Sequence, residues 1–201
     1  MLKHRALRIG LLLGATALLT VSCVSSKPVV IQAKLPVISQ SQDGYDLELE
    51  FLDEQTLAAR FGKENNPFVS PPSLLKLNQM MVFELTINNT SSPKAQLKLD
   101  MIELQFGGKV KSPTNRFHFS DFWETLIKRS DQYRGWNHGR VEQIINKNVY
   151  DNKTSIDQGT THKGFVVFMG NLSRFGTADI YIPLFNDGKT ELKRFKFTFE
   201  F

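Results

Sequence analysis

The residue with the most distinctive chemistry in this 201-residue chain is Cys23, its only cysteine. One cysteine cannot form an intramolecular disulfide, so the sequence predicts no disulfide framework. The thiol precedes a polar stretch in which it would contribute little to packing. It also follows directly on a basic and then apolar segment, and this position points to covalent modification of the thiol during export.

The first 22 residues have the layout of a secretory signal. Residues 1–8 are basic, residues 9–21 are mainly apolar, and the small residue Ser22 precedes the cysteine. The apolar run is interrupted by Gly10 and Gly14, and it is shorter than the roughly 20 residues that a bilayer-spanning helix needs. We therefore predict a signal peptide over residues 1–22.

The segment Leu18-Leu-Thr-Val-Ser-Cys23 resembles a bacterial lipobox, although the family usually has Leu, Val or Ile where Thr20 stands. The resemblance implies that Cys23 is acylated and becomes the first mature residue. Two or more acyl chains suffice for stable anchoring in a membrane. Because Val24 is not Asp, the resemblance also implies the outer membrane. The alternatives are a secreted protein with an incidental cysteine and an uncleaved membrane anchor.

Other motifs that could do chemistry are incomplete. His118, His138 and His162 stand in no metal-ligand spacing. Gly188-Lys-Thr190 lacks the preceding glycine of a phosphate-binding loop, and Asp151–Asp157 lacks the glycine of a calcium loop. The sequence therefore predicts a non-catalytic protein with no metal and no cofactor. An enzyme whose site one sequence does not reveal is a further class.

One segment combines aromatic and basic residues in an unusual density. Aromatic residues and arginine dominate the energetics of protein interfaces, and aromatic rings also stack on sugars. The segment therefore predicts an exposed partner-binding patch. The alternative is that Trp136 packs the segment onto the rest of the domain. The candidate residues are Tyr133, Arg134, Trp136, His138 and Arg140.

The charge balance argues against nucleic acid as a partner. The chain has 25 Lys and Arg against 20 Asp and Glu, and three of the basic residues lie in the predicted signal. The mature chain therefore has 22 against 20, so its apparent basicity belongs mainly to the signal.

Most of the chain after residue 44 has the alternating pattern of β-strands. Residues 45–51, 81–87 and 195–201 place apolar side chains on one face and polar ones on the other. Residues 97–106 form a further predicted strand, and residues 164–170 predict a strand buried on both faces. The turn Asn186-Asp-Gly188 predicts a hairpin between residues 180–185 and 192–201.

Two segments favour helices. Asp53 caps a short predicted helix that Gly62 ends. The longer interruption, residues 116–150, contains a capping pair at Asp121 and Glu124. Its predicted apolar face is formed by Phe122, Leu126 and Ile127. Residues 140–145 form another predicted turn or two of helix.

These patterns predict one mostly β domain over residues 45–201, joined to Cys23 by a tether over residues 23–44. The Asn-rich turn after residue 87, the strand that follows it and the segment 159–168 resemble an immunoglobulin-like antiparallel β-sandwich, over residues 45–106 and 159–201. The insertion at 116–150 is not part of that pattern, and the inter-sheet cysteine pair of antibody domains is missing.

Taken together, the sequence predicts a lipid-anchored protein of the cell envelope that presents a β-sandwich to a protein partner. A surface carbohydrate-binding or adhesive module is the second candidate, and it predicts exposed aromatic side chains in a shallow row.

Overall fold

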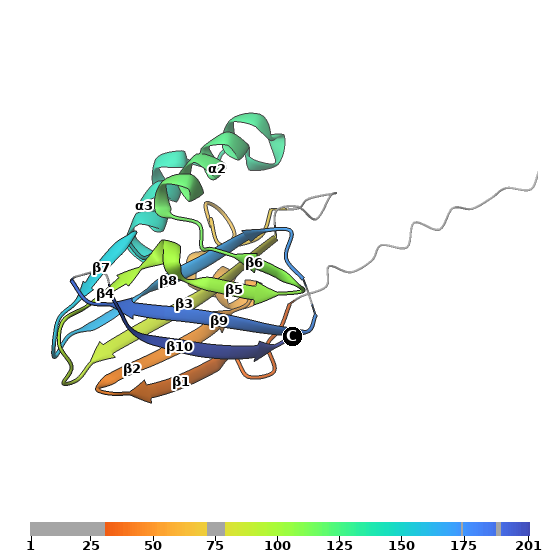
Figure 1. Cartoon of the computed structure of the whole chain (residues 1–201). Helices are drawn as coiled ribbons and strands as arrows, with labels where there is room; N and C mark the ends of the chain where they lie inside the picture. Colours follow the sequence, from red (N-terminus) through yellow and green to blue (C-terminus); the bar gives the residue numbers. More distant parts are fainter. Residues whose placement is uncertain (1–30, 72–78, 174, 188–189) are drawn as a thin grey trace, which may run out of the picture.

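The computed structural model describes residues 31–71, 79–173, 175–187 and 190–201. This part of the chain is mostly β, as the alternating patterns predicted, with two antiparallel sheets and three α-helices. Figure 1 shows the two sheets lying face to face, with α2 and α3 rising from one side of them. The predicted signal and Cys23 lie outside the described residues.

The first sheet has four strands in the order β1-β2-β3-β8. Its members are β1 (Val37–Gln42), β2 (Tyr45–Leu52), β3 (Gln79–Asn89) and β8 (Thr161–Gly170). The second sheet has the order β6-β5-β9-β4-β7, with β10 on the other side of β9. Its members are β4 (Ala95–Lys98), β5 (Glu103–Phe106), β6 (Lys109–Lys111), β7 (Lys153–Ile156), β9 (Thr177–Phe185) and β10 (Glu191–Glu200).

The main core lies between the two sheets. Leu47 and Leu49 of β2 are buried there, while Glu48 between them faces outward. Phe195, Phe197 and Phe199 of β10 face them from the second sheet. Both alternating patterns therefore do what the sequence predicted, because successive side chains of a strand point to opposite faces.

A second core lies on the outer face of the first sheet. The helices α1 (Glu54–Phe61), α2 (Arg116–Arg129) and α3 (His138–Asn148) pack there together with Phe68. The prediction that β8 is buried on both faces is confirmed, since Phe165 and Val167 belong to this second core and Val166 and Phe168 to the main one.

The helical insertion is attached to the free edge of β8. Val149 forms a parallel bridge with Phe165, and the Tyr150 N–H donates to the Phe165 carbonyl at 3.1 Å. On the other side of the insertion, the Thr114 N–H donates to the Val167 carbonyl at 2.7 Å. These bonds occupy backbone groups that an edge strand otherwise leaves unpaired.

The start of α2 differs from the prediction. Asn115 caps the helix by accepting a hydrogen bond from the His118 N–H at 2.9 Å, so Asp121 lies inside the helix and caps nothing. In α1 the predicted cap is confirmed, since Asp53 accepts from the Thr56 N–H and Gly62 follows the last residue. Asn, like Asp, is a favoured cap, so the capping prediction for Asp121 is wrong.

The predicted strand over residues 97–106 is broken in the middle. A 3-10 turn at Leu99–Met101 separates β4 from β5, and both halves pair with β9. The reason is visible in the apolar pattern, which changes from odd positions at Leu97 and Leu99 to even positions at Ile102 and Leu104. A strand keeps its apolar residues on one face only if an extra residue is accommodated where the pattern shifts.

The predicted tether extends too far toward the domain. Residues 37–42 form β1, which pairs with β2 along its whole length, with Val37 opposite Glu50 and Gln42 opposite Tyr45. Asp43 and Gly44 form the two-residue turn with φ angles of 50° and 78°. Two positive φ angles suit the twist of a hairpin, and Asp-Gly adopts them readily. At the other predicted hairpin, β9 and β10 pair with Phe185 opposite Glu191.

Replacing Phe165 tests whether the second core stabilises the sandwich. Its ring is 2% exposed and lies 4.9 Å from the Phe68 ring, so Phe165→Ala is expected to lower the free energy of unfolding by about 3–5 kcal/mol. Phe117→Ala is the matched control, because Phe117 is 69% exposed and its loss is expected to cost no more than about 0.5 kcal/mol. Equal effects in chemical denaturation would contradict the two-core arrangement.

Candidate functional site

The structure separates the predicted aromatic and basic patch into a packed part and an exposed part. Tyr133 is only 6% exposed and Trp136 is half-buried against the second core. Arg134 and Arg140 are exposed, and His138 is half-buried. The residues lie near one another at the α2–α3 connection, but the expected exposed aromatic surface is not formed. Whether they bind a partner stays a prediction.

The aromatic part is held by Trp123 of α2. The Trp136 ring stacks on the Trp123 ring at 5.2 Å, and the Tyr133 ring meets both edge-on at 5.3 Å and 4.8 Å. Trp123 is itself buried and donates its Nε1–H to the Pro67 carbonyl at 2.9 Å. Burial also raises the pKa of the Tyr133 hydroxyl. The packing alternative therefore describes Tyr133 and Trp136.

Arg134 and His138 of the polar part make weak local contacts. The Arg134 guanidinium forms an ion pair with Asp131 at 2.7 Å, and both side chains are largely exposed. His138 Nε2 lies 3.3 Å from the Ser120 hydroxyl on α2. Exposed ion pairs of this kind contribute at most about 1 kcal/mol, so Arg134 is available to another carboxylate at little cost.

A different surface emerges on the outer face of the first sheet. Residues paired across antiparallel strands share a face, so the register places Ser39, Glu48 and Thr86 in one row. The next row holds Ser41, Asp46 and Asn88. We call these six residues the polar face.

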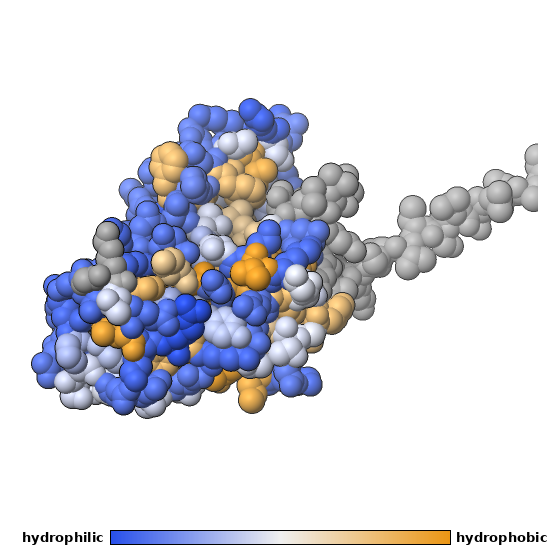
Figure 2. Space-filling view, viewed as in Figure 1, coloured by the Kyte–Doolittle hydropathy of each residue, from blue (hydrophilic) through white to orange (hydrophobic). Residues whose placement is uncertain are grey.

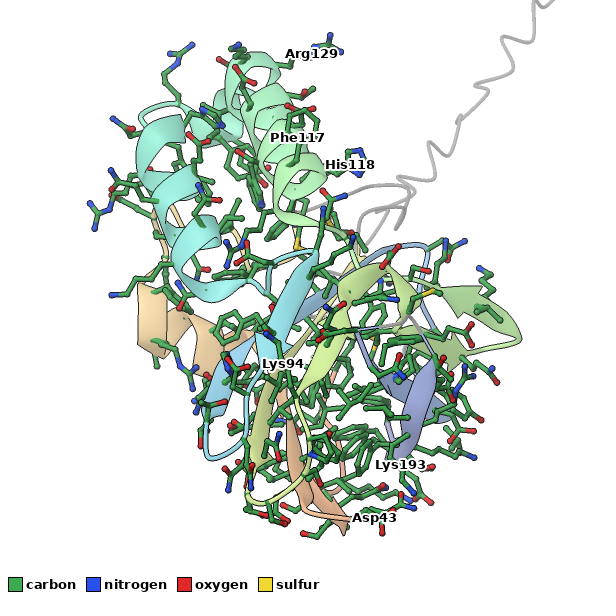
Figure 3. All side chains as sticks on the ribbon, turned by 60° about the vertical axis from the view of Figure 1, so that its left-hand side comes forward. Asp43, Lys94, Phe117, His118, Arg129 and Lys193 are labelled. Atoms are coloured by element: carbon green, nitrogen blue, oxygen red, sulfur yellow. The ribbon has the colours of Figure 1, made fainter. Side chains whose placement is uncertain are left out.

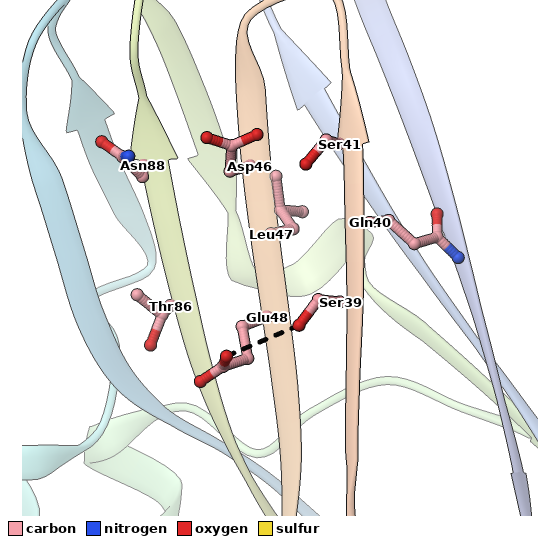
Figure 4. Close-up of a pocket in the computed structure, with 8 residues that line it drawn as sticks. All are labelled: Ser39, Gln40, Ser41, Asp46, Leu47, Glu48, Thr86 and Asn88. Atoms are coloured by element: carbon pink, nitrogen blue, oxygen red, sulfur yellow. Dashed lines mark hydrogen bonds between the residues drawn. The ribbon is translucent and has the colours of Figure 1, made fainter.

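The polar face forms a shallow depression of about 220 Å³ that Gln40 and Leu47 also line. Figure 4 shows side chains of the polar face projecting from β1, β2 and β3, with the Ser39 hydroxyl donating to Glu48 at 3.5 Å. Lys163 and Thr161 of β8 continue the two rows, and Thr161 donates to the Asn88 side chain at 3.2 Å. The surface therefore crosses all four strands, and its carboxylates are on β2.

The polar face ends where the helices begin to cover the sheet. Glu84 of β3 is 7% exposed and accepts hydrogen bonds from Arg60 of α1 at 2.8 Å and 3.4 Å. Lys163 Nζ lies 3.0 Å from Oε2 of the same carboxylate. Arg60 also lies over the Phe165 ring at 5.6 Å. This ion cluster joins α1 to the sheet at the boundary between its covered and open parts.

The ion cluster also affects a buried tyrosine. Tyr150 follows the insertion and donates its hydroxyl to the Leu85 carbonyl at 3.1 Å. Burial raises the pKa of Tyr150 far above its usual value, and the nearby negative charge of Glu84 adds to the effect. A neutral tyrosine that donates one hydrogen bond has a structural role here, because it connects the end of the insertion to the middle of β3.

The histidines and carboxylates do not converge. His118 lies on α2, His138 on α3 and His162 on β8. Across the ranges that the structure describes, no three His, Cys, Asp or Glu side chains lie close enough to hold a metal ion. Figure 3 shows Phe117 and His118 on the outside of α2, remote from Asp43 and Lys193 at the opposite part of the molecule.

Sequence reasoning identified two of the six residues of the polar face. The alternation in residues 45–51 indicated a wet face that contains Asp46 and Glu48. It did not connect them with Ser39, Thr86 and Asn88, because only the strand register brings these side chains together. The Asp-Gly turn at residues 43–44 was the available signal, since it pairs residues 37–42 with residues 45–50.

Comparisons with known proteins give little further information. No family model matches the chain, and no curated protein matches it. A crystal structure of a functionally unknown protein from Listeria monocytogenes EGD-e is similar over 86% of each chain, with a TM-score of 0.42 and 10% sequence identity. Similarity at this level supports no argument about function.

Replacing Trp136 distinguishes packing from partner binding. The stacking on Trp123 predicts that Trp136→Ala lowers the free energy of unfolding by about 2 kcal/mol, roughly half the cost for a fully buried tryptophan. Arg134→Ala is the control, because its side chain is 84% exposed and its loss is expected to change stability by less than about 0.5 kcal/mol. Unchanged stability of Trp136→Ala together with weaker capture of a partner would instead assign a binding role.

Proposed function

We propose that this chain is a non-catalytic, lipid-anchored protein of the cell envelope that binds a partner protein through the polar face. The observation that carries the proposal is the division of the outer face of the first sheet. One half is covered by helices and the other half is left open with hydroxyl, amide and carboxylate groups. An exported domain with one open, polar sheet face is suited to recognition.

The dimensions of the polar face favour a macromolecular partner. A volume of about 220 Å³ is below the roughly 300–1,000 Å³ of typical small-molecule sites. The surface is open and continues onto β1, an edge strand of its sheet. Asp46 and Glu48 make β2 acidic there, so the best complement is a partner surface with lysine or arginine and hydrogen-bond donors.

The proposed anchor is acylated Cys23, and the resemblance to a lipobox supports it. The proposed membrane is the outer membrane, on the same resemblance. In the described ranges no helix is long and apolar enough to cross a bilayer. The immunoglobulin-like assignment is also part of this proposal, and two antiparallel sheets packed face to face support it.

The carbohydrate-binding alternative has less support. It relies on exposed aromatic rings in a row, and Tyr133 and Trp136 instead contact Trp123. The exposed phenylalanines in the described ranges, Phe117 and Phe175, lie on α2 and on the connection between β8 and β9. These positions form no common row.

Removing the thiol tests the anchor. Cys23→Ala is expected to abolish incorporation of a labelled fatty acid and to release the protein from the membrane fraction, because no acyl chain can then be attached. Ser26→Ala, which keeps the cysteine, is the control and is expected to remain acylated. A Cys23→Ala protein that stays in the membrane fraction would contradict the proposed anchor.

Reversing the charge of the polar face tests the partner site. Brief crosslinking in cells, followed by solubilisation and mass spectrometry, is expected to identify a stoichiometric envelope protein. The double variant Asp46→Lys/Glu48→Lys is expected to reduce its capture by about tenfold or more, because like charges then face each other. Asp100→Lys, at an exposed acid of the 3-10 turn between β4 and β5, is the control. Equal capture of the partner by the unmodified protein and by both variants would exclude the polar face as the partner site.

A further inference from the structure

Several connections meet at one end of the sandwich, which we call the tether end. The Lys34 N–H donates to the Glu200 carbonyl at 3.0 Å on one side of β10. On the other side, Gly176 and Phe201 exchange two backbone hydrogen bonds at 3.0 Å and 3.1 Å. The chain that leads from Cys23 therefore joins the domain beside the last residues of β10, which Figure 1 marks with C.

Exposed apolar side chains gather at the tether end. Leu35 is 70% exposed and Phe175 is 67% exposed, and each is adjacent to a residue that bonds to the end of β10. Val37 of β1 is 42% exposed on the outer face of the first sheet, and Val110 of β6 is 62% exposed on the outer face of the second sheet. In Figure 2 apolar colour is visible near this end of the molecule among mainly hydrophilic residues. Single exposed apolar residues are ordinary, whereas a cluster indicates a contact surface.

Lysines accompany these apolar side chains. Lys34 is 74% exposed, although it pairs with Glu200. Lys109 reaches the Asn171 carbonyl at 3.3 Å, and Lys111 ends the same strand. Lys34 therefore lies beside the end of β10, and Lys109 lies beside the connection that carries Phe175. Apolar side chains flanked by lysines suit the boundary between anionic lipid headgroups and acyl chains.

The length of the tether holds this end close to a bilayer. Leu35 is twelve residue steps from Cys23, which allows a span of at most about 40 Å. A surface that is kept so near the membrane has a high effective concentration there, so a weak contact is populated.

We propose that the tether end rests on the anchoring membrane, with Leu35 and Phe175 inserted at the headgroup boundary. The proposal depends on the lipid anchor at Cys23 proposed above. In this arrangement β10 leads away from the bilayer, and Leu192 near its start lies about 27 Å from Glu200 at roughly 3.3 Å per residue. The polar face begins at Ser39, two residues after Val37. Its row that contains Asp46 then lies on the side away from the membrane.

Site-specific labelling tests the contact in the full-length acylated protein. Once Cys23 is acylated, an introduced cysteine is the only free thiol, so Leu35→Cys and Phe175→Cys can each carry an environment-sensitive fluorophore. Leu192→Cys is the matched control, because Leu192 is a partly exposed apolar residue at the opposite end of β10. Each protein is reconstituted into vesicles of phosphatidylethanolamine and phosphatidylglycerol that carry a quencher on the acyl chain.

The expected result is a blue-shifted emission at positions 35 and 175 and quenching at least roughly twice that at position 192, because side chains at the boundary lie within reach of the acyl chains. Equal, water-like emission at all three positions in vesicles that retain the acylated protein overturns the membrane contact and leaves the anchor intact. Flotation and mass spectrometry of Cys23 read the anchor separately. An unmodified Cys23 in protein that does not float with the vesicles overturns the anchor. Because the proposed membrane contact depends on the anchor, this result overturns the contact as well.

Discussion

The burial of β8 on both faces is the constraint on which the rest of the architecture depends. Val166 and Phe168 point into the main core, so Phe165 and Val167 must point away from it. Two large apolar side chains on the outer face of a sheet require a second layer, because leaving each in water costs about 1.5–3 kcal/mol. Helices α1, α2 and α3, with Phe68, supply that layer. The helical insertion is therefore part of the core structure and not a peripheral addition to it.

The second layer covers only part of the sheet because the outer-face rows change character along the strands. The row of Leu52, Val82 and Val167 is apolar, and the rows beyond Glu84 are polar. Glu84 marks the change, and its carboxylate is compensated by two cations, one from α1 and one from β8. A buried charge without such partners would be strongly unfavourable. The helices thus stop at an ion cluster, and the polar face begins there.

This arrangement separates three surfaces that have different chemistry. The tether end carries exposed leucine, valine and phenylalanine side chains beside lysines. The polar face carries carboxylates, amides and hydroxyls on the far half of the first sheet. The α2–α3 connection carries arginines on a packed aromatic base. In an anchored protein the tether end would face the lipid and the polar face would face a partner. This arrangement is consistent with a scaffold that holds a recognition surface at a set distance from the membrane.

Local patterns in the sequence determined the strands with one wet face, the double burial of β8, the cap of α1 and the chemical identity of Cys23. Each of these depends on neighbouring residues alone. The tertiary structure decided which strands pair, and hence that Ser39, Asp46 and Asn88 share a surface, because register brings together residues that are distant in sequence. It also decided that Trp136 packs on Trp123, since an aromatic residue in a polar segment has no local signal for burial. The break at Leu99–Met101 lies between these cases: the shift in the apolar pattern was visible, but its meaning followed only from the pairing of both halves with β9.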